Sequence, residues 1–214
     1  MMVSGSEKIS LEGIHNIIFD LGGVILDIDI PKAKEAFHKL GITDIDNLFG
    51  LGHASSVFKR QEIGKVSDDD FIAELNKISS STLNKEKVFK AWNSLLIGFP
   101  EERIELLRKL KPQYRLFLFS NTNSIHVKTF EKMFHSKFQS SFSDLFEKIY
   151  YSHVMGLRKP DAASFQFILK DSNLKSEETL FIDDALNNIE GAKAVGLKTL
   201  HIEKGMELVT VWKS

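Results

Sequence analysis

The sequence predicts an α/β fold with three layers, in which helices cover both faces of a parallel sheet and an all-helical segment is inserted. Five short apolar runs are typical of buried strands, and helical stretches alternate with them at the spacing of βαβ units. From Pro31 to about Leu96, no convincing strand appears. The chain has 214 residues, of which 43% are hydrophobic, so it can form a substantial core.

The first strand is predicted at Asn16–Asp20, an apolar β-branched run that Gly22 and Gly23 follow. An uninterrupted apolar run of this kind indicates a strand buried on both faces. The crossover connections of βαβ units require a parallel sheet. The other predicted strands span 114–119, 148–151, 179–183 and 198–202, and the predicted helices span 101–110, 124–134, 161–171 and 186–195.

The inserted segment is predicted to be a small helical domain at residues 30–98, with residues 1–29 and 99–214 forming the α/β core. Ser67 and Asp70 have the spacing of a capping box, which predicts a helix beginning at residue 68. Residues 61–65 read as a loop. The predicted helical pieces are Pro31–Leu40, a short piece around 53–60, 68–78 and 85–96.

Composition excludes several classes of protein. The 28 Lys and Arg against 29 Asp and Glu give a net charge of -1, so we expect no nucleic-acid partner. The absence of cysteine excludes disulfides, thiolate zinc sites and cysteine nucleophiles. No signal-peptide pattern appears, and no apolar run approaches the ~20 residues that cross a bilayer. We therefore expect a cytoplasmic protein with no membrane association, as a monomer or weak homodimer.

Polar side chains follow four of the predicted strands. In an open parallel sheet, ligands bind beyond the carboxyl ends of the strands, so these residues are expected to lie together. They are Asp20, Ser120-Asn121-Thr122, Arg158-Lys159-Pro160 and Asp183-Asp184.

This set predicts both a metal and a substrate class. Adjacent carboxylates repel one another unless a cation neutralises them, and an all-oxygen site suits Mg²⁺. Lys159 and the loop at Ser120 then require an anion, and a phosphoryl group meets both demands. The sequence thus predicts a small-molecule phosphate ester as substrate, with one carboxylate attacking phosphorus to form an aspartyl phosphate.

Four motifs in this order resemble those of the haloacid dehalogenase-like (HAD) hydrolases, over residues 16 to 202. That family has a Rossmann-like core, and its small helical cap matches the inserted segment. The motifs are Phe19-Asp20-Leu21-Gly22-Gly23-Val24, Phe119-Ser120-Asn121-Thr122, Arg158-Lys159-Pro160-Asp161, and Phe181-Ile182-Asp183-Asp184 with Asn188 and Gly191.

The resemblance implies a role for each motif. Asp20 is the nucleophile and a metal ligand, and Lys159 stabilises the charge of the phosphorane. Ser120 and Asn121 hold the phosphate beside the Gly22-Gly23 backbone, and Gly22 offers its carbonyl to the metal. Asp184 anchors Mg²⁺ together with Asp183, which alternatively orients the ligands without touching the metal. Ser120 alternatively caps the helix predicted at 124–134.

Gly22 departs from the pattern of typical phosphatases in the family, which have a second Asp there as general acid and base. That role is typically worth 10²–10⁴-fold in rate. A bacterial branch that includes an α-D-glucose-1-phosphate phosphatase resembles this sequence and carries the same Gly. An anomeric phosphate leaves as a hemiacetal oxygen, so a sugar 1-phosphate needs the acid less. Alternatively, Asp27 or Asp29 supplies the acid, although both read more simply as capping or hinge residues.

Two other functions stay open at this point. Gly22 is also compatible with a catalytically impaired protein that binds phosphate or a partner, and dehalogenases of the superfamily likewise lack the second Asp. A positive φ is one structural reason for a glycine at 22. In the helical segment, residues Glu62–Lys65 and His53 are the candidates to face the substrate.

Overall fold

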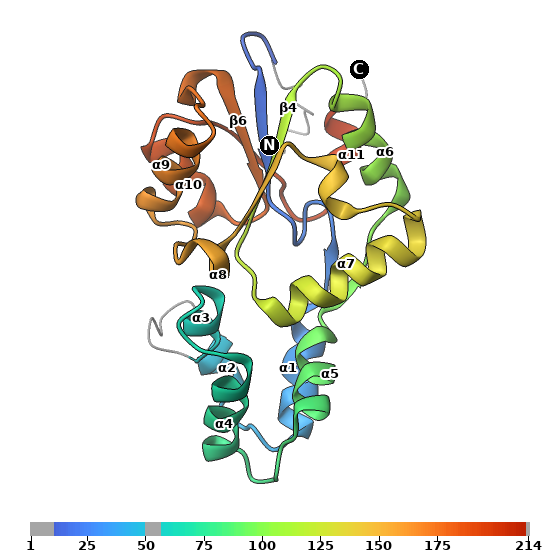
Figure 1. Ribbon diagram of the computed structural model, residues 1–214, viewed down its shortest axis with the longest axis vertical. Helices are drawn as coiled ribbons and strands as arrows, with labels where there is room; N and C mark the ends of the chain where they lie inside the picture. Colours follow the sequence, from blue (N-terminus) through green and yellow to red (C-terminus); the bar gives the residue numbers. More distant parts are fainter. Residues whose placement is uncertain (1–10, 50–56, 213–214) are drawn as a thin grey trace, which may run out of the picture.

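The computed structural model describes residues 11–49 and 57–212, which include a five-stranded parallel sheet of order β5-β4-β1-β6-β7 (Figure 1). This confirms the predicted α/β fold, and each strand begins and ends within one residue of its prediction. The strands are β1 (Asn16–Phe19), β4 (Arg115–Ser120), β5 (Lys148–Tyr151), β6 (Thr179–Asp183) and β7 (Lys198–His201).

The middle of the sheet is buried on both faces, as the apolar runs predict. Every residue of β1 and of β6 is buried. Phe19 of β1 pairs with Leu118 of β4 on one side and with Ile182 of β6 on the other. This register brings the carboxyl ends of β4, β1 and β6 to the same edge of the sheet.

Helices form a layer on each face. Phe19 and Leu118 pack with α6 (Glu101–Leu110), α7 (Ser124–Phe138) and α11 (Leu208–Val211). Ile18 and Phe117, which point to the opposite face, pack with α9 (Ala162–Asp171) and α10 (Leu186–Ala194). Figure 1 shows α9 and α10 on one side of the sheet and α6 and α11 on the other.

A helical segment lies beyond the edge of the sheet where β1 ends (Figure 1). Its own apolar core includes Phe37, Phe58, Phe71 and Trp92. Ser67 caps α4, accepting a hydrogen bond from the Asp70 amide as the capping-box spacing predicts. The helices are α1 (Ile30–Lys39), α2 (Ile45–Phe49), α3 (Val57–Glu62), α4 (Asp68–Ile78) and α5 (Lys85–Asn93).

The structure corrects the predicted segment in several places. The chain leaves α5 at Asn93 and forms β3 (Leu96–Gly98), which pairs antiparallel with β2 (Asp27–Ile28). Helix α3 extends through Glu62, so the predicted loop at 61–65 is two residues shorter. The sequence did not predict α2 or α8 (Ser152–Met155). No helix within the described ranges is long and apolar enough to cross a bilayer.

Candidate functional site

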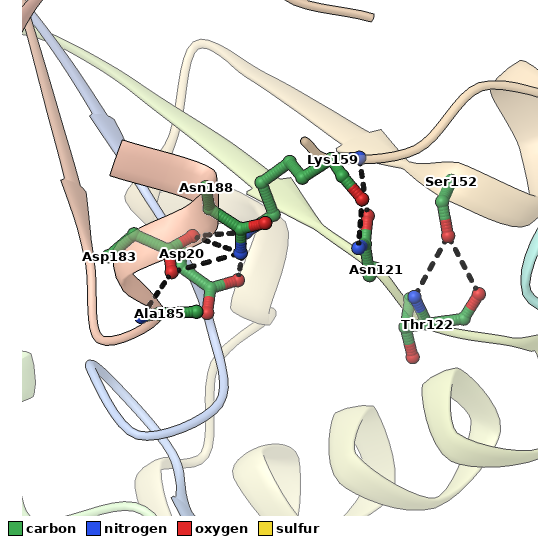
Figure 2. A network of polar contacts seen from close by, with 8 residues as sticks. All are labelled: Asp20, Asn121, Thr122, Ser152, Lys159, Asp183, Ala185 and Asn188. Carbon is green, nitrogen blue, oxygen red and sulfur yellow. Dashed lines mark hydrogen bonds and ion pairs between the residues drawn. The ribbon is translucent and has the colours of Figure 1, made fainter. Parts of the chain in front are cut away.

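A buried lysine joins two carboxylates at the carboxyl edge of the sheet (Figure 2). Lys159 Nζ lies 2.6 Å from Asp20 Oδ1 and 2.7 Å from Asp183 Oδ2. Lys159 is 1% exposed and Asp183 is fully buried. The three residues lie far apart in the sequence. The parallel register of β1 with β6 brings the carboxylates of Asp20 and Asp183 together.

Burial and neighbouring charges shift the acidity of these groups. Burial raises the pKa of Asp20 to about 7, because the Lys159 charge opposes the shift only in part and Asp183 adds to it. Burial alone would lower the pKa of Lys159, but the charges and hydrogen bonds of Asp183 and Asp20 outweigh it and raise the pKa. Lys159 therefore stays an ammonium ion between the carboxylates.

Asp183 and Asp184 are adjacent in sequence but differ in their surroundings. Both oxygens of Asp183 accept hydrogen bonds from Asn188 Nδ2, at 3.0 and 3.1 Å, and Oδ1 also accepts from the Ala185 amide at 2.8 Å. Asp184 is exposed, and partial burial followed by the charge of Asp183 raises its pKa. Asp183 is thus already hydrogen-bonded within the protein, whereas Asp184 is available to a ligand.

The three carboxylates suit a hard cation. Ligand oxygens of Asp20, Asp183 and Asp184 all lie within 4.8 Å of one another. Such a cluster of like charges is favoured when a divalent ion binds, and oxygen donors are the ligands that Mg²⁺ prefers. The glycine at position 23 leaves room for the Asp184 side chain. Gly23 has a φ of +76°, and a Cβ there would lie 2.2 Å from Asp184 Oδ2.

The segment after β4 forms the second side of the site. Asn121 is tied to the backbone of Lys159, since its Nδ2 donates to the carbonyl and its Oδ1 accepts from the amide, both at 3.0 Å. The Thr122 amide donates to Ser152 Oγ at 2.9 Å, as Figure 2 shows. Ser120 is buried at the end of β4. It does not cap α7, because Asn123 Oδ1 accepts the first free amides of that helix.

A cavity of about 280 Å³ opens beside these residues. Gly22 and the segment Ser120–Thr122 of the core line it, together with Trp92 and Glu62 of the helical segment. Glu62 Oε2 lies 3.0 Å from an Arg158 guanidinium nitrogen, next to Lys159 in sequence. The predicted reach of the 62–65 stretch into the site therefore holds for Glu62. His53 lies outside the described residues.

Gly22 does not have the positive φ that would explain a glycine there. That conformation belongs to Gly23. A Cβ at Gly22 would lie 3.0 Å from Ile28 Cδ1, the end of a flexible side chain. A larger residue at 22 therefore requires only a local movement of Ile28.

The two alternative acids have structural partners. Asp27 Oδ1 accepts a hydrogen bond from buried Arg103 at 2.8 Å, and Arg103 also contacts Glu207 at 2.9 Å. Asp29 caps α1 by accepting from the Lys32 amide at 3.0 Å. Neither aspartate lines the cavity. Asp29 thus has the capping position that the sequence favours, and Asp27 is held in an ion pair with Arg103.

Sequence reasoning missed His126, which lines the cavity from the first turn of α7. The signal was present in the sequence, because His126, Phe130 and Phe134 are spaced at i, i+4 and i+8 and share one helix face. A histidine on an otherwise apolar stripe is buried there beside the site, where it is 6% exposed.

The chain resembles known proteins over most of its length. It is 34% identical over 194 residues to the D-ribitol-5-phosphate phosphatase of Bacteroides thetaiotaomicron, covering 91% of this chain and 94% of that protein. It is also 33% identical over 205 residues to the glyceraldehyde 3-phosphate phosphatase of Methanocaldococcus jannaschii, covering 90% and 86%.

The fold of this chain is also similar to those of solved structures. A HAD family enzyme of Bacteroides thetaiotaomicron in complex with magnesium and inorganic phosphate has a TM-score of 0.86 at 30% identity, covering 94% of this chain and all of that one. The L-2-haloacid dehalogenase of Xanthobacter autotrophicus, at 14% identity with a TM-score of 0.56 and covering 88% and 77%, shares the fold. A family model described as haloacid dehalogenase-like hydrolase matches residues 14–196. This chain belongs to the haloacid dehalogenase-like hydrolase family.

Proposed function

We propose that the protein is a Mg²⁺-dependent phosphomonoester hydrolase that acts on a small hydroxylated metabolite, a sugar or sugar-alcohol phosphate. The observation that carries this proposal is the ammonium of Lys159 held between Asp20 and Asp183, with Asp184 beside them. Phosphatases among the similar proteins, and the magnesium and phosphate bound in a similar structure, support it.

The proposed reaction proceeds in two steps. A carboxylate oxygen of Asp20 attacks phosphorus in line with the leaving oxygen, and the aspartyl phosphate that forms is then hydrolysed by water. The Lys159 ammonium, together with Ser120 and Asn121, stabilises the charge on the transferring phosphoryl group. The Gly22-Gly23 backbone lies against the same group.

The proposed Mg²⁺ ligands are Asp20, Asp184 and the Gly22 carbonyl. Mg²⁺, when bound, neutralises these carboxylates and the phosphate charge. Asp183, which is saturated with hydrogen bonds from Lys159, Asn188 and Ala185, orients the lysine and the neighbouring carboxylates.

We also propose that residues 30–98 act as a cap over the cavity. Trp92 and Glu62 line the same cavity as Ser120, and the Glu62–Arg158 pair joins the helical segment to the core. A cap of this kind excludes water from the reacting phosphate and selects the leaving group. The cytoplasmic location and the weak or absent dimerisation expected from the sequence stay predictions.

A phosphatase screen with and without Mg²⁺ tests the proposed function. The panel contains D-ribitol 5-phosphate, glyceraldehyde 3-phosphate, glucose 1-phosphate, glucose 6-phosphate and p-nitrophenyl phosphate. We expect phosphate release that a chelator abolishes and Mg²⁺ restores. No hydrolysis at saturating Mg²⁺ would favour the phosphate- or partner-binding protein, and chloride release from 2-chloropropionate would favour the dehalogenase.

A further inference from the structure

A buried imidazole nitrogen lies beside the cavity without a partner. His126 Nε2 is buried and has no hydrogen-bond partner among the described residues. Buried polar atoms in proteins are almost always hydrogen-bonded, so an unpaired atom in the wall of a ligand cavity is a position for a ligand atom. Two more atoms of this lining, Glu62 Oε2 and Arg158 Nε, are buried without a hydrogen bond, but these two side chains form an ion pair at 3.0 Å. Trp92 Nε1 donates to Gln61 Oε1 at 3.0 Å, so His126 Nε2 has neither a hydrogen bond nor an ion pair among the described residues.

The contacts of His126 determine whether Nε2 is a hydrogen-bond donor or an acceptor. Nδ1 lies 3.1 Å from Asn93 Oδ1, and a carbonyl oxygen can only accept. Nδ1 therefore carries the ring proton, and Nε2 presents its lone pair as an acceptor. Burial keeps the ring in this neutral form, because it lowers the pKa of His126 to about 3.

Neighbouring groups fix the orientation of the ring. The Trp92 ring packs against it with centroids 4.3 Å apart and an interplanar angle of 55°. Asn123 Oδ1 accepts from the His126 amide at 3.0 Å, which fixes the backbone one turn from the Ser120–Thr122 segment. The acceptor is thus held in place before a ligand binds, so binding requires little further ordering of the His126 side chain.

We propose that His126 Nε2 accepts a hydrogen bond from a hydroxyl group of the substrate and thereby selects polyol and sugar phosphates over esters without that hydroxyl. This inference rests on the proposed function and adds a specificity-determining residue to it. His126 contacts the hydroxylated part of the substrate and takes no part in the reaction at phosphorus. A ligand without a hydroxyl leaves the acceptor unpaired, and sites of this kind discriminate strongly against such ligands.

The test compares His126→Phe, which removes the acceptor and keeps a ring, with His126→Gln, whose side-chain oxygen can replace Nε2. D-ribitol 5-phosphate and glucose 1-phosphate are the hydroxylated substrates, and p-nitrophenyl phosphate is the control without hydroxyls. We expect His126→Phe to lower kcat/KM for whichever hydroxylated ester the wild type hydrolyses by about 10- to 100-fold, mostly through KM. With p-nitrophenyl phosphate the change stays within about threefold, and His126→Gln recovers part of the loss.

A binding measurement separates this inference from the reaction itself. In the Asp20→Asn background, adding His126→Phe should weaken calorimetric binding of D-ribitol 5-phosphate or glucose 1-phosphate by a similar factor and leave the affinity for inorganic phosphate unchanged. Equal losses for esters and phosphate, or for p-nitrophenyl phosphate, would show a structural role and overturn the inference. So would no loss at all, or no binding of either ester by the parent variant. A wild type that hydrolyses no ester but still binds them in this way would overturn the proposed function alone.

Discussion

At the scale of single residues, the site depends on how one buried ammonium is shared. Lys159 contacts Asp20 and Asp183 at nearly equal distances, so removing either carboxylate takes away one of the two charged partners of the buried ammonium. A buried ion pair that loses one partner is strongly destabilised. Substitutions at these carboxylates therefore require separate measurements of folding and of chemistry.

Asp20→Asn should abolish turnover and leave the protein folded. The amide is nearly isosteric with the carboxylate, but it cannot attack phosphorus or balance a bound cation. We expect kcat to fall by about 10³-fold or more, measured as phosphate release. Wild-type protein should also bind beryllium fluoride at Asp20, as a mimic of the aspartyl phosphate. Activity within a few-fold of wild type would contradict the assignment of the nucleophile.

Asp184→Asn and Asp183→Asn should have different effects. Asp184 is exposed and available to a cation, whereas Asp183 holds Lys159 and Asn188. We expect Asp184→Asn to raise the Kd for Mg²⁺ by about tenfold or more, and Asp183→Asn to lower the free energy of unfolding by about 3 kcal/mol. Calorimetric Mg²⁺ titration and urea denaturation measure the two effects. Equal effects of both substitutions on Mg²⁺ affinity would disprove these separate roles of Asp184 and Asp183.

Gly22→Asp should help substrates with poor leaving groups. The φ at this position suits any residue, and the new Cβ meets only the end of Ile28, so the added carboxyl can act as a proton donor. We expect glucose 6-phosphate hydrolysis to rise by about tenfold or more, with little change for p-nitrophenyl phosphate. Wild-type rates should fall steeply with leaving-group pKa, so glucose 1-phosphate should react faster than glucose 6-phosphate.

Gly23→Asp is the matched control, because a side chain there requires a positive φ and collides with Asp184. It should lose activity on every ester. A wild type whose rates are independent of leaving-group pKa would contradict the prediction for Gly22 and indicate a proton donor already present. Glu62, the acidic residue in the cavity wall, would then be the first candidate.

At the scale of elements, the sequence predicts the strands that carry the site because they are buried on both faces. Continuous apolar runs such as Ile17–Phe19 and Leu180–Ile182 have no other stable location, and the polar residue after each run marks the end of the strand. The parallel connections then place these ends at one edge. The candidate residues Asp20, Ser120 and Asp183 followed from these two facts.

Other elements have no comparable signal. Strands β2 and β3 have two and three residues, and they form because distant segments meet, so no local pattern announces them. Helix α2 has five residues, too few to show a helical period. The sequence places Glu62 near the site but does not show its ion pair with Arg158, which lies almost one hundred residues away in the chain. Contacts between distant segments that do not follow from the parallel sheet, such as this ion pair, could not be predicted from the sequence.

Gly64→Ala should impair the approach of the helical segment to the core. Gly64 has a φ of +68°, and a Cβ there would lie 2.3 Å from the His153 carbonyl oxygen of α8. We expect kcat/KM to fall by about tenfold or more, since small displacements of a substrate-positioning wall are costly. Gly156→Ala is the control, because it shares the positive φ of +70° but meets no atom within 4 Å. Equal losses for the two variants would assign the effect to backbone strain.

At the scale of the whole molecule, the site lies where two apolar cores meet. Ile28 and Leu96 pack against both the core of the sheet and the core of the helical segment, and they belong to the paired strands β2 and β3. His126 is buried at the same junction: its helix α7 covers the sheet, while its ring packs on Trp92 of the helical segment. Burial at this junction therefore disfavours the protonated form of the His126 ring.

The stability of the molecule should accordingly depend on pH through His126. Its pKa is about 3 in the folded protein and about 6.5 when unfolded, so below pH 6.5 the unfolded chain binds a proton that the folded protein does not. The contribution of the neutral ring to stability is complete above pH 6.5 and is lost as the pH falls toward 3. Between pH 7 and pH 5 this loss amounts to about 2 kcal/mol.

The comparison of wild type with His126→Gln isolates this contribution. Asp20 acts in the opposite direction, because its raised pKa makes the folded protein the stronger proton binder below pH 7, but both proteins share that effect. Urea denaturation in chelator at pH 7, 6 and 5 gives the free energy of unfolding of each protein. We expect the difference, wild type minus variant, to decrease by about 2 kcal/mol from pH 7 to pH 5. A difference that stays constant over this range would mean that the imidazole titrates alike in both states, and His126 would not be a neutral, buried acceptor.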